Sequence, residues 1–197
     1  MVANLYEPKP RDGAPRWRGW RRPMDNAQRI NQDSGDTEYY TPQPIIEAAR
    51  RTLGEIDLDP ASSSAANARV RALRFFAAQD DGLKQKWAGR VWMNHPFSRI
   101  GNALWIAKLI GAYKCGDVVA ACCITFSATS EKWFQPLMLY PQCFLSPRTN
   151  YFIADGSKKV GVTKGSVVTY LGADLDGFAC QFQSMGVVKV PLSRIAR

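Results

Sequence analysis

The sequence predicts an α/β fold in which a mixed sheet is covered by helices on both faces and ends in an antiparallel C-terminal edge. Strand-like and helix-like segments alternate through the first two thirds of the chain, which is typical of a sheet covered by helices. Residues 117–124 form an almost wholly apolar run, as expected of a central parallel strand. The last third consists mainly of short strand-like segments linked by polar turns, which suits an antiparallel edge.

The first helix is predicted to begin at Thr41, which can act as the N-cap with Pro42 in the first turn. Apolar residues then recur at helical spacing as far as Leu53, and Gly54 ends the helix. Residues 55–59 alternate between polar and apolar side chains and predict a short strand.

The remaining elements follow from the same periodicities. Helices are predicted over residues 66–76, 99–114 and 130–139. Strands are predicted over residues 89–94, 117–124, 142–146, 150–154, 165–171 and 178–185. A loop of small residues covers 61–66, and a turn lies at 80–82.

The composition predicts one domain with a nucleic-acid partner. The chain has 197 residues, enough for an α/β domain with a sizeable core. Its net charge of +9 favours a polyanionic partner, most simply nucleic acid. An odd number of cysteines, five, and a single histidine indicate free thiols in a reducing cytoplasm and no metal site. No stretch is long enough to span a membrane and we see no export signal, so we expect a cytoplasmic protein.

Positive charge is concentrated in residues 1–35, which we interpret as a basic, Pro- and Arg-rich arm before a single domain of residues 36–197. Tryptophans lie among the arginines of the arm, a combination that suits phosphate contact and stacking on bases. A tail without contacts fits this composition equally well. The predicted DNA-binding residues are Arg16, Trp17, Arg18, Trp20, Arg21, Arg22 and, beyond the arm, Arg99.

The most informative local feature is the string Asn94-His95-Pro96-Phe97 at the end of a predicted buried strand. The side-chain oxygen of Asn94 and the main-chain carbonyl of His95 are hydrogen-bond acceptors, and Pro96 restricts the backbone of His95. Two fixed acceptors can hold the exocyclic amino group of a nucleobase, and Phe97 offers a surface on which a flipped base can stack. The alternative is a strand that ends in a Pro turn, with Phe97 packed in the core.

A second constellation lies at the end of the strand predicted over residues 55–59. Ligands of open α/β sheets bind at the carboxyl ends of strands. Here Asp59 is followed by the small residues of the 61–66 loop, which allow a ligand to approach the backbone closely. The carboxylate of Asp59 is therefore a candidate ligand-binding group, and the alternative is that it caps the following turn.

In order and spacing, these pieces resemble the phage-type DNA adenine-N6 methyltransferases, the Dam-like family. The resemblance covers about residues 36–100 and is carried by Thr41-Pro42, Asp59-Pro60-Ala61-Ser62 with Asn67, Asp81-Gly82-Leu83, Trp87-Ala88-Gly89 and Asn94-His95-Pro96-Phe97. It implies a class I methyltransferase (Rossmann-like) fold that uses S-adenosylmethionine. The implied reaction methylates N6 of a flipped adenine in double-stranded DNA, with single-stranded DNA left open and no metal required.

The resemblance also implies roles for individual residues. The implied catalytic residues are Asn94, His95, Pro96 and Phe97. The implied cofactor-binding residues are Tyr40, Thr41, Pro42, Asp59, Pro60, Ala61, Ser62, Asn67, Asp80 and Asp81. Among these, Asp59 or a neighbouring carboxylate would receive the ammonium of the cofactor. His95 stands where the family usually has proline, and a tolerated substitution explains it better than a general-base role.

Three alternatives stay open. Cytosine N4 presents a similar amino group to the same acceptors, an inactive domain would only bind DNA, and an RNA-acting methyltransferase would differ in substrate. The recognition sequence, the degree of specificity and the oligomeric state are not predicted. A phage origin, the cytoplasm of a bacterial host as location and a part in restriction–modification rest on the family alone.

Overall fold

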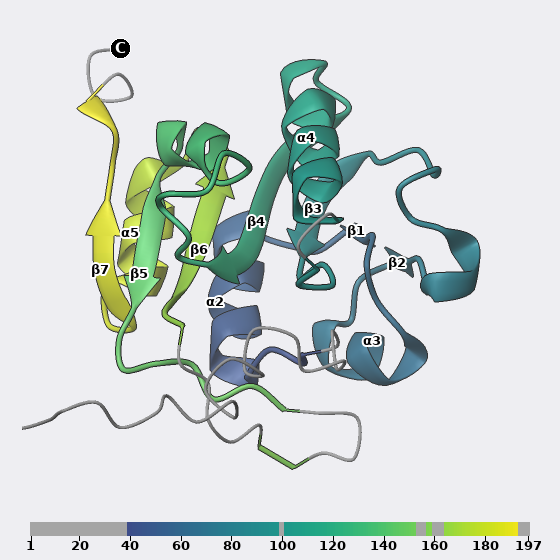
Figure 1. Cartoon of the computed structure of the whole chain (residues 1–197), viewed down its shortest axis with the longest axis horizontal. Coiled ribbons are helices and arrows are strands. Elements are labelled where there is room, and N and C mark those ends of the chain that lie inside the picture. Colours follow the sequence, from purple (N-terminus) through teal and green to yellow (C-terminus); the bar gives the residue numbers. More distant parts are fainter. Residues whose placement is uncertain (1–38, 99–100, 153–156, 159–163, 193–197) are drawn as a thin grey trace, which may run out of the picture. The chain divides into compact units, whose positions relative to one another are not determined.

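The computed structural model describes residues 39–98, 101–152, 157–158 and 164–192, and Figure 1 shows how its elements are arranged. The strands are β1 (Leu58–Asp59), β2 (Arg74–Phe75), β3 (Gly89–Met93), β4 (Val118–Phe126), β5 (Gln142–Leu145), β6 (Ser166–Leu171) and β7 (Gly186–Lys189). The helices are α2 (Gln43–Leu53), α3 (Ser64–Val70), α4 (Gly101–Lys114) and α5 (Leu175–Phe182), with 3-10 turns η1 (Ala78–Asp80) and η2 (Gln135–Leu139).

The strands form one seven-stranded sheet in the order β2-β1-β3-β4-β6-β5-β7. Strands β1 to β4 pair in parallel, whereas β6, β5 and β7 are joined to β4 and to one another by antiparallel pairs. The apolar run predicted as a central strand is β4, which lies between β3 and β6. The structure therefore confirms the predicted mixed α/β fold and its antiparallel C-terminal edge.

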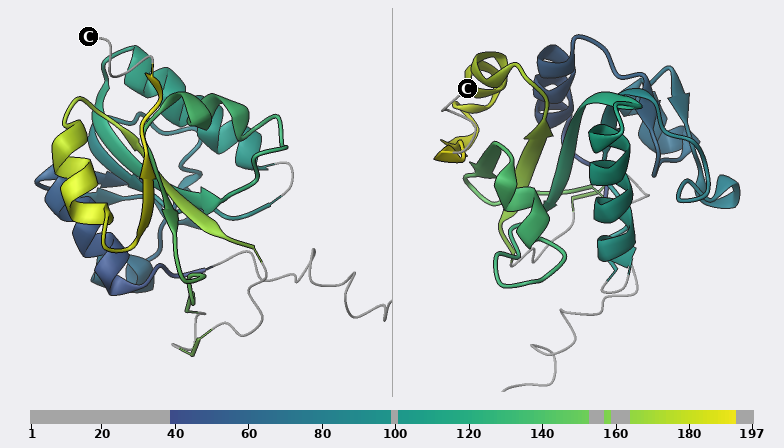
Figure 2. Two further views of the ribbon diagram at one scale, coloured as in Figure 1. Left: turned by 90° about the vertical axis from the view of Figure 1, so that its left-hand side faces the viewer. Right: turned by 90° about the horizontal axis from the view of Figure 1, so that it is seen from above.

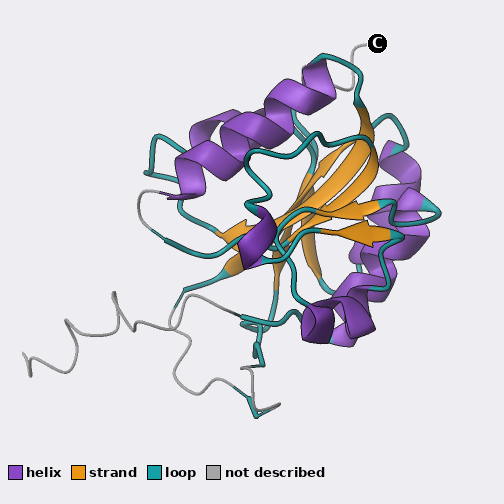
Figure 3. Ribbon diagram, turned by 90° about the vertical axis from the view of Figure 1, so that its right-hand side faces the viewer, coloured by secondary structure: helices purple, strands orange, loops and turns teal. Residues whose placement is uncertain are grey.

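Different helices cover the two faces of the sheet, as Figures 2 and 3 show. Successive side chains of a strand point to opposite faces, and β4 follows this rule. Its residues Cys122 and Ile124 pack into the core shared with α2, α3 and α5. Ala121 and Cys123 pack into the opposite core, which includes Ile106 of α4. The predicted helices on both faces are confirmed.

Helix α2 forms as the periodicity predicts, except at its first residue. Pro42 occupies the N-cap position without a side-chain cap, so the expectation that Thr41 caps the helix is wrong. Ile45 and Ile46 are among the residues that α2 buries against the sheet, and Gly54 ends the helix with a φ of 79°. That left-handed backbone is easily adopted by glycine, as predicted.

The helix predicted over residues 66–76 is wrong in its second half. Helix α3 ends at Val70, and Arg71 follows with a left-handed φ of 50°. The side chain of Asn67 accepts from the amide of Ala72 at 2.9 Å and thereby closes the turn. The chain then continues as β2, which pairs with β1. Local side-chain bonding at Asn67 ends the helix earlier than apolar spacing suggested.

The strand predicted over residues 178–185 is also wrong, because most of this segment is helix α5. Asp174 caps the helix by accepting from the amide of Gly177 at 2.8 Å. Phe178 and Phe182, four residues apart, are both fully buried on the side that faces the sheet. The spacing of these two rings is helical, and β7 begins only at Gly186.

Three smaller differences concern element length. The strand predicted over residues 55–59 is limited to β1, and the helix predicted over 130–139 is limited to η2. Within the segment predicted as the strand 150–154, Phe152 forms isolated bridges with Tyr40 and Lys158, and residues 153–154 lie outside the described part.

The carboxyl ends of β1 and β3 form the point where the chain changes direction across the sheet. From β1 the chain proceeds to β2 on one side, and from β3 it proceeds to β4 on the other. Asp57 and Arg90 hold these two strands in register: the guanidinium donates to both carboxylate oxygens, each at 2.9 Å. Ligand sites of open α/β sheets lie at such a switch point.

Candidate functional site

A pocket opens at the carboxyl ends of β1, β2 and β3, at the switch point of the sheet. Ten of the residues that were predicted to form the site line it: Tyr40, Thr41, Asp59, Pro60, Ala61, Ser62, Asp81, Asn94, His95 and Pro96. These residues come from four separate segments of the chain. The fold therefore brings together the two constellations that the sequence analysis singled out.

Asn94 follows β3 directly, and its side chain has a defined orientation. Its amide nitrogen donates to the main-chain carbonyl of Tyr39. Because a carbonyl only accepts hydrogen bonds, this contact fixes the nitrogen toward Tyr39 and leaves Oδ1 as the acceptor on the other branch. Oδ1 is therefore the acceptor atom of this side chain, and its contact with a nucleobase stays a prediction.

His95 contributes a main-chain carbonyl that accepts no hydrogen bond from the described residues, whereas the next carbonyl, that of Pro96, accepts from Ser98 at 2.8 Å. The imidazole is 1% exposed, and burial lowers the pKa of His95 to about 4. At neutral pH the ring is uncharged. Its Nδ1 is buried and lacks a hydrogen-bond partner within the described part of the chain.

Asp59 is a buried carboxylic acid that lines the pocket at the end of β1. It is 2% exposed, and burial raises its pKa to about 7, although hydrogen bonds from Ser62 and the Ala61 amide act in the opposite direction. Over the described residues it forms no ion pair with a lysine or arginine. A buried carboxylate without a cationic partner is stabilised when a cationic ligand binds beside it.

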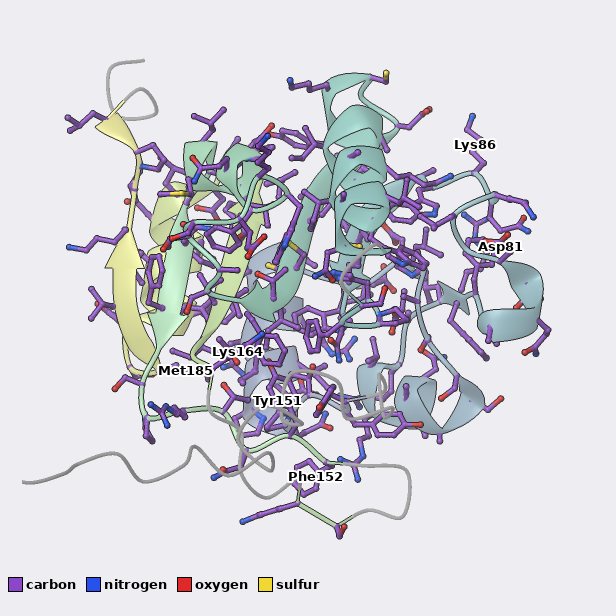
Figure 4. All side chains as sticks on the ribbon, viewed as in Figure 1. Asp81, Lys86, Tyr151, Phe152, Lys164 and Met185 are labelled. Carbon is purple, nitrogen blue, oxygen red and sulfur yellow. The ribbon has the colours of Figure 1, made fainter. Side chains whose placement is uncertain are left out.

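Asp81, which is labelled in Figure 4, follows η1 directly, and Asp81 and Gly82 both line the pocket. Asp81 has a left-handed φ of 48° and forms an ion pair with Lys84 at 2.8 Å. A Cβ on Gly82 would lie 2.0 Å from the carbonyl oxygen of Pro60. Only glycine allows this turn to pack so closely against the loop that follows Asp59.

Four of the predicted residues lie outside the lining of the pocket. Pro42 begins α2, Asn67 bonds to the backbone of Ala72, and Asp80 accepts from the amide of Ala77 at 2.8 Å. Phe97 packs among aromatic rings, with its centroid 4.4 Å from that of Phe126. These contacts account for each side chain structurally, and ligand contacts of these four residues stay predictions.

The predicted DNA-binding residues cannot be placed. Arg16, Trp17, Arg18, Trp20, Arg21, Arg22 and Arg99 all lie outside the described residues.

Several wall residues were not predicted from the sequence, among them Tyr39, Arg69, Phe76 and Trp105. Trp105 stacks on Trp87 at a centroid distance of 5.8 Å and lies one helical turn from Asn102, the hydrogen-bond partner of His95. Phe76 follows the short strand β2, which was interpreted as helix. Arg69 lies on α3 one turn after Ala66, another lining residue. Had the end of α3 been predicted correctly at Val70, Phe76 would have been expected at the end of a strand.

The described residues lack two kinds of feature. No group of three or more His, Cys, Asp or Glu side chains is arranged to hold a metal ion in this part of the chain. No helix formed by these residues has both the length and the apolar character needed to cross a membrane.

The fold and the pocket define an α/β protein with its candidate ligand site at the carboxyl ends of neighbouring parallel strands. The family model described as DNA N-6-adenine-methyltransferase (Dam) matches residues 28–171, which is well over half of the chain. The chain therefore belongs to the Dam family, and the resemblance seen in the sequence is confirmed. Curated proteins gave no match.

Proposed function

We propose that this protein transfers a methyl group from S-adenosylmethionine to N6 of an adenine that has rotated out of duplex DNA. Membership of the Dam family supports DNA adenine methylation as the activity. In the proposed step the lone pair of N6 attacks the methyl carbon while the carbon–sulfur bond breaks. The sulfur keeps the electron pair of that bond, and the nitrogen then loses one proton to solvent.

The observation that carries the proposal is the orientation of Asn94. Its Oδ1 is the acceptor branch of an amide whose nitrogen is held by Tyr39, and the carbonyl of His95 lies one residue further on. Two acceptors on the two amino hydrogens draw the nitrogen lone pair out of conjugation with the ring. Preorganised dipoles of this kind act without reorganisation during the reaction. Asn94 and His95 are therefore the proposed groups that orient the target nitrogen.

The pocket wall also suits S-adenosylmethionine. Asp59 provides a carboxylate for its ammonium, and Thr41 adds a buried hydroxyl that has no partner among the described residues. The order of the strands favours one direction for the ligand. We propose that the adenosine lies toward β2, near Asp81, and that the methyl group lies toward β3, near Asn94.

Base flipping is proposed because a duplex cannot place N6 at the end of β3 without unstacking the adenine. Tyr39 lines the pocket and lies 5.7 Å from Phe97 between ring centroids. The flipped base is proposed to stack against this aromatic group. The basic arm and Arg99 remain the proposed contacts to phosphates, which position DNA without reading its sequence.

The test is methyl transfer from labelled S-adenosylmethionine to duplex DNA, single-stranded DNA and RNA, followed by mass spectrometry of the nucleosides. N6-methyladenine from DNA is the expected product. N4-methylcytosine would contradict the choice of base, and methylation of RNA alone would contradict the choice of DNA. If S-adenosylmethionine binds but no product forms on any substrate, the proposal is wrong and a domain that only binds DNA becomes the favoured function.

A further inference from the structure

Arg69 is a cation in the pocket wall that has no carboxylate partner within the described residues. Two other guanidinium groups form ion pairs: Arg71 binds Glu47 at 2.8 Å, and Arg90 binds Asp57 at 2.9 Å. Arg69 is partly buried instead of projecting freely into water. A partly buried guanidinium without an anion in a pocket is a group that can bind an anionic ligand.

The position of Arg69 is fixed by its neighbours. The guanidinium carbon lies 4.8 Å from the ring centroid of Phe152. The backbone of Phe152 is in turn bonded to Tyr40 in both directions, at 2.9 and 3.0 Å. At the other end, Gln43 donates to the main-chain carbonyl of Arg69 at 3.3 Å. Through Phe152, the Arg69 guanidinium therefore packs against the segment that contains the pocket residues Tyr40 and Thr41.

The pocket thus contains a carboxylate and a guanidinium that form no ion pair with each other: Asp59 and Arg69. We propose that Arg69 binds the α-carboxylate of S-adenosylmethionine while Asp59 binds its ammonium. This inference rests on the proposed function. The amino-acid end of the ligand carries both charges on one carbon, and a guanidinium fork can donate hydrogen bonds to both oxygens of a carboxylate. A phosphate of DNA is the less suitable partner, because Arg69 is partly buried in the wall of the pocket.

The test compares two ligands and three proteins by isothermal titration calorimetry. S-adenosylmethionine carries the carboxylate, and decarboxylated S-adenosylmethionine lacks it but keeps the ammonium and the sulfonium. The proteins are the wild type, Arg69→Met and the control Arg51→Met. Arg51 is an exposed arginine of α2 that bonds Gln181 and does not line the pocket.

Arg69→Met is expected to weaken S-adenosylmethionine binding by about 10- to 100-fold, the range for hydrogen bonds to a charged group. It should change binding of the decarboxylated ligand by less than about threefold, and Arg51→Met should leave both unchanged. Equal weakening of both ligands, or no weakening, would overturn the inference, as would a loss of DNA affinity alone. If the wild type bound neither ligand, the proposed function itself would fail, which is a separate outcome.

Discussion

The imidazole Nε2 of His95 lies 3.0 Å from the side-chain oxygen of Asn102, which joins the end of β3 to the first turn of α4. Because an amide oxygen only accepts, Nε2 carries the proton and Nδ1 is the unprotonated nitrogen. This contact holds the ring of the residue whose carbonyl we propose as the second acceptor. Asn102 therefore contributes to the geometry of the site from outside the motif.

Replacing Asn102 by Ala is expected to destabilise the protein by about 1–3 kcal/mol, because a buried N–H of His95 loses its acceptor. Asn102→Asp keeps an acceptor at this position and should lose less stability. Urea unfolding monitored by tryptophan fluorescence measures both variants. A free energy of unfolding for Asn102→Ala that matches the wild type would show that the hydrogen bond has no net structural effect.

Asp59 and His95 are expected to give opposite pH dependences of stability. Burial lowers the pKa of His95 to about 4, so between pH 6.5 and 4 the unfolded chain binds the extra proton and stability falls on acidification. Burial raises the pKa of Asp59 to about 7, so over the same range the native state binds the extra proton and stability rises on acidification. The two contributions nearly cancel in the wild type.

Single substitutions should reveal how much each residue contributes to the pH dependence of the free energy of unfolding. Asp59→Asn should become less stable from pH 6.5 to 4 by about 1.4 kcal/mol per pH unit relative to the wild type, and His95→Pro should change by a similar amount in the opposite direction. Urea unfolding across this pH range measures both slopes. Parallel curves for all three proteins would contradict the assignment of these two titrations.

Binding of S-adenosylmethionine should release protons at pH 6. In the free protein Asp59 is mostly protonated at this pH, because burial raises its pKa to about 7. A bound ammonium favours the carboxylate and so lowers that pKa. Calorimetry in two buffers of different ionisation enthalpy should detect close to one released proton in the wild type and none in Asp59→Asn. Binding without proton release in the wild type would refute the proposed ion pair.

Gly82→Ala tests the close approach of the two pocket loops. The new methyl group would lie 2.0 Å from the Pro60 carbonyl oxygen, so the backbone must shift. We expect a loss of about 1–3 kcal/mol in stability, together with weaker cofactor binding. Gly111→Ala in α4 is the matched control, because nothing lies within 4 Å of its added carbon. Thermal unfolding measures the difference, and equal melting temperatures for the two variants would contradict the packing argument.

The sequence predicted the architecture well wherever periodicity alone determines the element. Apolar runs identified β3 and β4, and helical spacing identified α2 and α4. It failed where tertiary context decides. The segment that became α5 contains enough apolar residues for a strand, but the Asp174 cap and the stacking of Phe178 on Tyr170, with ring centroids 5.2 Å apart, favour the helix.

The site was predictable only in part for a related reason. Motif residues such as Asn94 and Asp59 lie at the carboxyl ends of strands, where ligands of open α/β sheets bind. Arg69 and Trp105 line the pocket from helices, and only the folded chain shows which face of each helix is turned toward the pocket. The hydrogen bond from Asn94 to Tyr39 joins residues 55 positions apart, so no local pattern reveals it.

The central claim is that Asn94 orients the amino group that receives the methyl group. The most direct measurement compares the initial rate of N6-methyladenine formation in duplex DNA by the wild type and by Asn94→Ala, with S-adenosylmethionine affinity and melting temperature measured on both proteins. We predict a rate at least about 100-fold lower for Asn94→Ala, as for loss of a preorganised catalytic dipole, with affinity changed less than about threefold. Equal rates in the two folded proteins would contradict the account.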